Sequence, residues 1–102
     1  NLHCTVVFAV SDYYALEFMR FLQVKGVRIP EDVQIIGFDD IAASRESIPA
    51  LTTIHQDAAQ RAKTAITCLE AMRSGSACDT QIILPVTLIC RESTRELPCQ
   101  TL

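Results

Sequence analysis

The chain has 102 residues, of which 49% are hydrophobic and 21% charged, and its formal net charge is −3. This length suits one small domain, and the apolar fraction is too high for a disordered tail. The longest apolar runs, such as residues 6–10, are far shorter than the ~20 residues of a membrane helix, so no membrane partner is expected. Nine scattered basic residues argue against direct binding of nucleic acid. The start at Asn1, without Met or a leader, suggests a piece of a longer protein.

Cysteine use indicates a reducing compartment, and hence a cytoplasmic protein. The five cysteines are odd in number and no two are separated by two residues, which is unlike a disulfide framework or a zinc site. We expect them to act mainly as small apolar packing residues, with the last of them exposed in a polar tail: Cys4, Cys68, Cys78, Cys90 and Cys99.

The first half of the chain has a strand, helix, strand pattern. Residues 5–10 form a continuous β-branched and aromatic run, typical of a strand buried on both faces. Ser11 and Asp12 are good N-caps for a helix that ends near Lys25 and Gly26. A second apolar run covers residues 33–38. The pattern predicts an α/β fold with an open parallel sheet, flanking helices and a right-handed crossover.

The second half is less regular. A polar loop is expected up to Pro49, followed by a short extended segment over residues 51–55. A helix with one apolar stripe is predicted from residue 57 to 73, ending at Ser74 and Gly75. Two strand-like runs, residues 81–84 and 86–90, are interrupted by Pro85. From residue 91 onward the chain is polar and is expected to fray.

The sequence offers no constellation for catalysis. Three glycines, Gly26, Gly37 and Gly75, are too few for a dinucleotide or phosphate loop. His3 and His55 stand alone, and no serine has an evident histidine partner. We therefore predict no catalytic residue, no metal site, no cofactor and no enzymatic activity.

One carboxylate lies where open parallel sheets bind ligands. Asp39 follows Gly37 and Phe38 at the carboxyl end of the second predicted strand, where diverging loops leave a crevice. Such a carboxylate can accept hydrogen bonds from two neighbouring hydroxyls of a sugar. The alternative is that Asp39 or Asp40 caps the turn through its own backbone.

Four blocks of the sequence, in order, resemble the last third of LacI/GalR-family transcriptional regulators. They cover residues 5–12 (TVVFAVSD), 27–40 (VRIPEDV leading to IGFDD), 48–56 (IPALTTIHQ) and 84–94 (LPVTLICREST). The resemblance implies part of a periplasmic-binding-protein-like type I effector domain. In that family a helix-turn-helix headpiece binds operator DNA, and this chain has no counterpart to the headpiece.

The resemblance also implies ligand contacts. The first aspartate after Gly-aromatic, here Asp39, contacts effector hydroxyls in the family. Ser11 stands where many members carry an asparagine that reaches the ligand, although it is equally explained as an N-cap. Gln56 matches a glutamine near the crossing between lobes, but a segment between lobes also needs polar side chains for its own backbone.

By the same resemblance, residues 1–102 form a partial effector-binding and dimerisation domain. Residues 5–56 belong mainly to the C-terminal lobe, residues 57–84 cross toward the other lobe, and residues 86–95 return. The predicted helix over residues 57–73 would then need a cover. It either folds back on the chain's own sheet or is exchanged with a second chain.

A homodimer is implied as well. Family members pair partly through the helix over residues 12–25 and the loop after Asp40, and the apolar residues of that helix occupy too wide an arc for one core. The alternative is a two-sided helix packed against parts that this chain lacks. The expected dimer contacts are Tyr13, Leu16, Met19, Ser44 and Ser47.

The predicted function is therefore effector sensing and dimerisation in a DNA-binding regulator. A carbohydrate bound between the lobes would shift operator affinity by favouring one lobe arrangement. Two alternatives remain from the sequence: a fragment of a periplasmic sugar-binding transport protein, and a small enzyme of flavodoxin-like shape.

Overall fold

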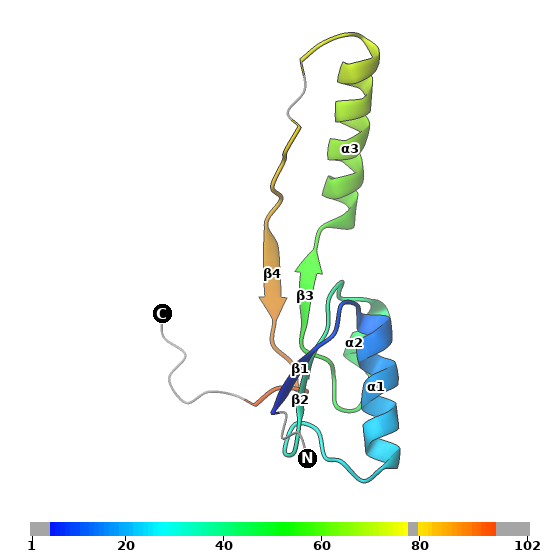
Figure 1. The fold of residues 1–102 in the computed structure, drawn as a ribbon, viewed down its shortest axis with the longest axis vertical. Coiled ribbons are helices and arrows are strands. Elements are labelled where there is room, and N and C mark those ends of the chain that lie inside the picture. The colour runs from blue at the N-terminus through cyan, green and yellow to red at the C-terminus, as the bar shows by residue number, and fades with distance from the viewer. Residues whose placement is uncertain (1–4, 78–79, 96–102) are drawn as a thin grey trace. The chain divides into compact units, whose positions relative to one another are not determined.

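The computed structural model describes residues 5–77 and 80–95. The chain divides into two compact units. Unit 1 combines the residues up to 55 with those from 87 onward, and unit 2 consists of residues 56–86 (Figure 1). Unit 1 is thus built from two separate stretches of the chain.

Unit 1 contains the predicted strand, helix, strand element. Strand β1 (Val6–Phe8) pairs in parallel with strand β2 (Gln34–Ile36), with Val7 opposite Ile35. Helix α1 (Asp12–Val24) connects them (Figure 1). The prediction of an α/β fold with a parallel sheet and flanking helices is confirmed.

Helix α1 begins and ends at the capping residues predicted from the sequence. The Ser11 hydroxyl accepts a hydrogen bond from the backbone N–H of Tyr14 at 3.4 Å, so it caps the orphan donors of the first turn. Lys25 is the C-cap, and Gly26 follows with a φ of +83°, a left-handed conformation that glycine adopts without steric cost.

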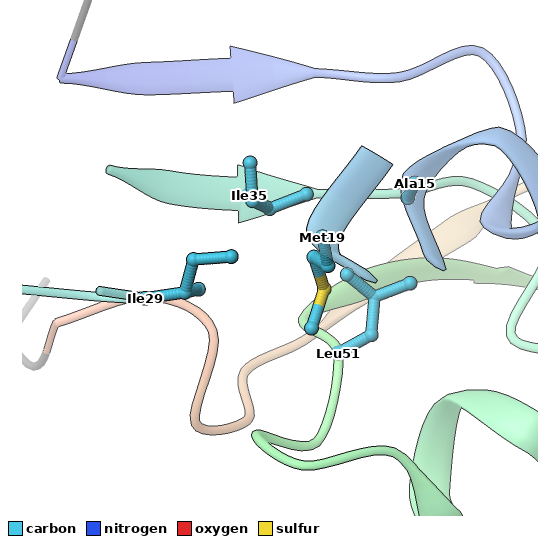
Figure 2. Close-up of a cluster of buried hydrophobic side chains, with 5 residues drawn as sticks. All are labelled: Ala15, Met19, Ile29, Ile35 and Leu51. Atoms are coloured by element: carbon cyan, nitrogen blue, oxygen red, sulfur yellow. The ribbon is translucent and has the colours of Figure 1, made fainter. Parts of the chain in front are cut away.

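The hydrophobic core of unit 1 is a five-residue cluster. Figure 2 shows these side chains converging from α1, β2 and the loops around them. Met19 of α1 is only 2% exposed, because its flexible thioether fills the space beside the branched side chains. The cluster consists of Ala15, Met19, Ile29, Ile35 and Leu51.

Strand β1 differs from its prediction. We expected it to be buried on both faces, but Val6 and Phe8 are 47% and 57% exposed. In the described part of the chain β1 pairs with β2 alone, and Val7 is the residue of β1 that packs against the core. The prediction of a strand within residues 5–10 is confirmed, and the prediction that both of its faces are buried is wrong.

The second half also shows two local differences. The expected polar loop contains a short helix, α2 (Ala42–Glu46). Strand β3 (Thr53–Gln56) pairs with strand β4 (Val86–Ile89), and the two run in opposite directions (Figure 1). Residues 81–84, predicted as a strand-like run, form no strand.

Residues 91–95 pack into unit 1 and do not fray as expected. Ser93 is fully buried: its hydroxyl donates to the Ile35 carbonyl at 2.6 Å and accepts from the Thr52 N–H at 2.8 Å. Its own N–H donates to the Ala50 carbonyl. A buried polar residue with three partners fixes this stretch to β2 and to the start of β3. Residues 96–102 lie outside the described residues.

Unit 2 contains helix α3 (Ala58–Arg73), which the apolar stripe and the Ser74-Gly75 end predicted. The Asp57 carboxylate accepts from the Gln60 N–H at 3.0 Å, and Gly75 follows the C-cap Ser74 with a φ of +80°. None of the α3 residues is buried. Cover of its apolar stripe, by the chain's own sheet or by exchange with a second chain, stays a prediction. The exposed stripe includes Ile66, Leu69 and Met72.

Two of the cysteines can be placed. Cys68 is half-buried in α3 and Cys90 is exposed after β4, and both are free thiols. The packing interpretation therefore fails for Cys90. Cys4, Cys78 and Cys99 fall on residues that are not described.

Gly37 tests how tightly unit 1 is packed. A Cβ at this position would overlap the Asp12 carboxylate and lie 2.9 Å from Cδ2 of Leu51. We expect Gly37→Ala to lower the free energy of unfolding by about 2–3 kcal/mol, because overpacking forces neighbouring atoms apart. Urea denaturation followed by circular dichroism measures the change.

The control is Gly26→Ala, which adds the same methyl group to open space. Its cost comes only from the positive φ and should be about 1 kcal/mol. Equal losses for the two variants would contradict the tight packing of Gly37 against Asp12.

Candidate functional site

Ser11 and Asp39 lie at the same edge of the parallel sheet. Phe8 of β1 is paired with Ile36 of β2, and each of the two site residues comes three positions after its strand's paired residue. The two loops touch, since the N–H of Asp12 donates to the Phe38 carbonyl at 2.9 Å. The structure thus brings these two predicted residues to the carboxyl ends of adjacent parallel strands, where α/β sheets bind ligands.

The backbone around Asp39 is strained. Asp39 has a φ of +123° and Asp40 a φ of +61°, a region that residues with a Cβ rarely adopt. Conformations of this kind cost on the order of 1–3 kcal/mol each and persist only where the surroundings hold them. Hydrogen bonds to β3 hold the backbone of both residues. The Asp39 N–H donates to the Ile54 carbonyl at 2.9 Å, and the Asp40 N–H donates to Oγ1 of Thr53 at 3.3 Å.

Asp40 is the centre of a charged cluster. Its carboxylate is 6% exposed and accepts from Nη2 of Arg91 at 2.6 Å, while Nδ1 of His55 lies 3.0 Å away on the other oxygen. The guanidinium of Arg45 stands at 3.9 Å. The Asp40 carboxylate therefore pairs with side chains from elsewhere in unit 1. These contacts differ from the alternative in which Asp40 caps its own turn. His55, expected to stand alone, is one of these partners.

Burial of the Asp40 carboxyl raises its pKa, but the hydrogen bonds from Arg91 and His55 outweigh this, and the pKa is lowered from its ordinary value. The charges of Arg91 and Arg45 act in the same direction. The carboxylate is accordingly ionised at neutral pH.

Asp12 is a second buried carboxylate, for which the sequence predicted only a capping role at the start of α1. It is fully buried and accepts from the hydroxyls of Ser44 and Thr53, both at 2.5 Å, and from the Ile41 N–H at 3.0 Å. Each of its oxygens has a partner, as burial of a charge requires. One feature of the sequence could have indicated the burial of Asp12. Gly37 has no side chain, and this leaves room for the Asp12 carboxylate.

Gln56 lies in unit 2, one residue beyond His55. Its Oε1 accepts a hydrogen bond from Nη1 of Arg61 at 2.9 Å. This bond joins two side chains, so it does not test the alternative in which Gln56 serves the backbone of the crossing segment, and ligand contact at Gln56 stays a prediction.

The expected dimer contacts on α1 differ in exposure. Tyr13 is 69% exposed, whereas Leu16 is half-buried and packs against the core. Met19 is a member of the core itself, as Figure 2 shows, so its surface is used inside the chain.

The expected contacts after Asp40 are used internally too. Ser44 is fully buried beside Asp12, which removes its surface from contact with a partner. The half-buried Ser47 donates to carbonyl oxygens at the turn before β3, with distances of 3.2 Å to Ser44 and 2.9 Å to Pro49. Its hydroxyl therefore has a structural use.

The described residues hold no cluster suited to a metal ion and no helix suited to a membrane. Within residues 5–77 and 80–95, no three side chains of the metal-binding types gather into a possible ion site. Among the helices of those same ranges, none has the length and hydropathy to cross a bilayer. Asp39 and Ser11 bring a carboxylate and a hydroxyl to the carboxyl ends of adjacent strands, a pair of group types that suits a ligand rich in hydroxyl groups.

Comparison with known proteins finds one family over nearly the whole chain. Residues 3–94 match the family described as "Periplasmic binding protein-like domain". Among curated proteins, the chain is 37% identical over 91 residues to the ribose operon repressor of Lactococcus lactis, covering 88% of the chain and 28% of that relative. The chain thus spans less than a third of the length of this relative.

Solved structures agree with this. The lac repressor dimer bound to operator and the anti-inducer ONPF superposes with a TM-score of 0.82 at 34% identity, covering 88% of this chain and 32% of that one. A periplasmic binding protein/LacI transcriptional regulator from Alkaliphilus metalliredigens, complexed with D-xylulofuranose, gives 0.81 at 38% identity, covering 90% and 35%.

The Asp40 cluster should make stability depend on acidity. Because the folded-state pKa of Asp40 is lowered, its stabilising contribution is complete above its unfolded pKa of about 4 and is lost as the pH falls through the folded value. We expect the free energy of unfolding to decrease below about pH 4, and Asp40→Asn to make that decrease shallower. Urea titrations between pH 7 and pH 3 measure it. The same slope in both proteins would contradict the assignment.

Proposed function

Since this chain belongs to the periplasmic binding protein-like domain family, we propose that it is the C-terminal part of the effector-binding domain of a LacI-type transcriptional regulator. The observation that carries the proposal is the loop after β2, which holds Asp39 in a strained conformation at the ligand-binding edge of a parallel sheet. The names of its relatives support a repressor over a transport protein or a flavodoxin-like enzyme. Operator binding, and with it a cytoplasmic location, would belong to the longer protein.

The proposed effector is a carbohydrate. Asp39 would accept hydrogen bonds from two of its hydroxyls, and Ser11 would reach it directly or through water. The structural relative with D-xylulofuranose supports a sugar as the ligand class. Gln56 is a further candidate contact from unit 2. No bond is made or broken, so no catalytic residue or cofactor is proposed.

The proposed mechanism is a population shift. An effector changes operator affinity only if it binds two arrangements of the regulator with different affinity. The coupling is reciprocal, so operator DNA would change effector affinity by the same factor. Residues of this chain would supply the effector contacts, and a headpiece elsewhere in the regulator the DNA contacts.

Removal of Asp39 tests the effector site. In the full-length regulator, sugars, sugar phosphates and nucleobases are screened for a rise in melting temperature, which reports preferential binding to the folded state. We expect Asp39→Ala to abolish the rise given by the active compound while leaving the ligand-free protein folded. The matched control, Asp32→Ala, removes an exposed carboxylate that is paired with Arg28 and should keep the full rise. If Asp39→Ala retains the rise, Asp39 does not bind the effector.

A homodimer is proposed through the exposed face of α1. Tyr13 and Leu16 are three positions apart and therefore share one helix face, next to the turn that holds Ser47. Met19 and Ser44 would support that face from inside, because both are buried. The structural relative described as a dimer supports the assembly.

Charge placed on this face should weaken the dimer. We expect Tyr13→Arg in the full-length regulator to raise the dimer dissociation constant at least ~10-fold, since a buried unpaired charge is strongly unfavourable. Sedimentation velocity across a dilution series measures it. The control is Tyr14→Arg, because Tyr14 is also exposed but lies roughly 160° around the helix from Leu16. Equal effects of the two variants would exclude this face as the interface.

A further inference from the structure

We propose that Asp40 is a positioning residue, whose carboxylate ties the Asp39 loop to both segments by which the chain leaves and re-enters unit 1. The inference rests on the proposed function in one respect only, namely that Asp39 binds the effector. The ties themselves are contacts within unit 1 and connect residues that are 15 and 51 positions apart in the chain.

The first step is that the loop needs an anchor. Two consecutive residues with positive φ are unfavourable for a free loop, and their N–H groups are held by two residues of β3, through the Ile54 carbonyl and the Thr53 hydroxyl. The Asp40 carboxylate adds charge-assisted hydrogen bonds, which are about twice as strong as neutral ones. Because Asp39 is its direct neighbour, the backbone at Asp39 is fixed by whatever holds Asp40.

The second step is where the anchor is attached. His55 is the last residue of unit 1 before the chain enters unit 2, and unit 1 resumes at residue 87, within β4. Arg91 follows β4 by two residues. One carboxylate therefore contacts a side chain at the outgoing segment and another just after the returning one.

The third step is that Arg91 is itself held in place. Its Nη1 donates to the Leu51 carbonyl at 3.0 Å, and its backbone N–H donates to Oγ1 of Thr52 at 2.8 Å. Leu51 is in the core, so Arg91 connects Asp40 to a residue of the buried cluster of unit 1. A guanidinium suits this task, since its planar fork can donate in two directions at once.

It follows that the position of Asp39 and the path of the crossing segments are linked through one ionised carboxylate. A change in the angle at which β3 or β4 leaves unit 1 would move His55 or Arg91, and with it the Asp39 loop. By reciprocity, a ligand that fixes Asp39 would favour one path of the crossing segments.

The test measures loop protection and affinity separately. In the full-length regulator, Asp40→Asn should speed amide hydrogen exchange at residues 39–41 at least ~10-fold more than it speeds exchange of the Ile35 amide in the core, which reports the general loss of stability. With D-ribose as the probe, calorimetry should show a dissociation constant at least ~10-fold higher. A purely structural loss would speed exchange at Ile35 and at residues 39–41 by the same factor. The control, Asp32→Asn, breaks the exposed pair with Arg28 and should change neither reading.

Two further variants keep the test decisive. Arg91→Lys retains the charge but loses the forked geometry, and should give an intermediate acceleration. If Asp40→Asn also exposes the Ile35 amide, His55→Gln is used instead, because it weakens only one tie and should accelerate exchange about threefold at residues 39–41. Wild-type protection of these residues in the folded variants would overturn the proposal. If D-ribose fails to bind even the wild-type protein, the sugar assignment is wrong for this compound, while the exchange result still decides the positioning role.

Discussion

The buried carboxylate of Asp12 is the interaction on which the rest of unit 1 depends. A charge removed from water is strongly unfavourable unless its lone pairs are occupied, and here hydroxyl and backbone donors from three distant places converge on it. These donors come from α2, from β3 and from the loop between β2 and α2. Asp12, the first residue of α1, therefore fixes the positions of α1, α2 and β3 relative to one another.

This arrangement explains why the candidate site can hold a strained loop. The loop runs from Gly37, which packs against Asp12, to Ile41, whose N–H also donates to Asp12. Between these points Asp39 and Asp40 must adopt positive φ values, and Asp40 reaches Arg91. Because both ends are set by one carboxylate, the geometry of Asp39 is imposed by its surroundings and not by its own preference.

Elements governed by local rules could be predicted from the sequence. Caps, spacing and glycine placement located α1 and α3, and the crossover rule gave parallel β1 and β2. Side chains whose partners lie far away in sequence could not be read in this way. Ser93 is bonded to Ile35 across 58 positions, and Ser44 to Asp12 across 32, so a polar tail and a polar loop in the sequence are buried in the fold. The position of Asp39 just after a strand could be predicted, because it is itself a local property, while its contact with a ligand stays a prediction.

The discontinuity of unit 1 has a consequence for how the chain is made. Ser93 and Arg91 complete contacts with Ile35, Leu51 and Asp40, yet they emerge from the ribosome only after the whole of unit 2. Until then β2 and the segment around Thr52 lack the polar partners that hold them. Unit 1 therefore cannot close until residues 91–93 have been made, and it stays unfinished while unit 2 is translated.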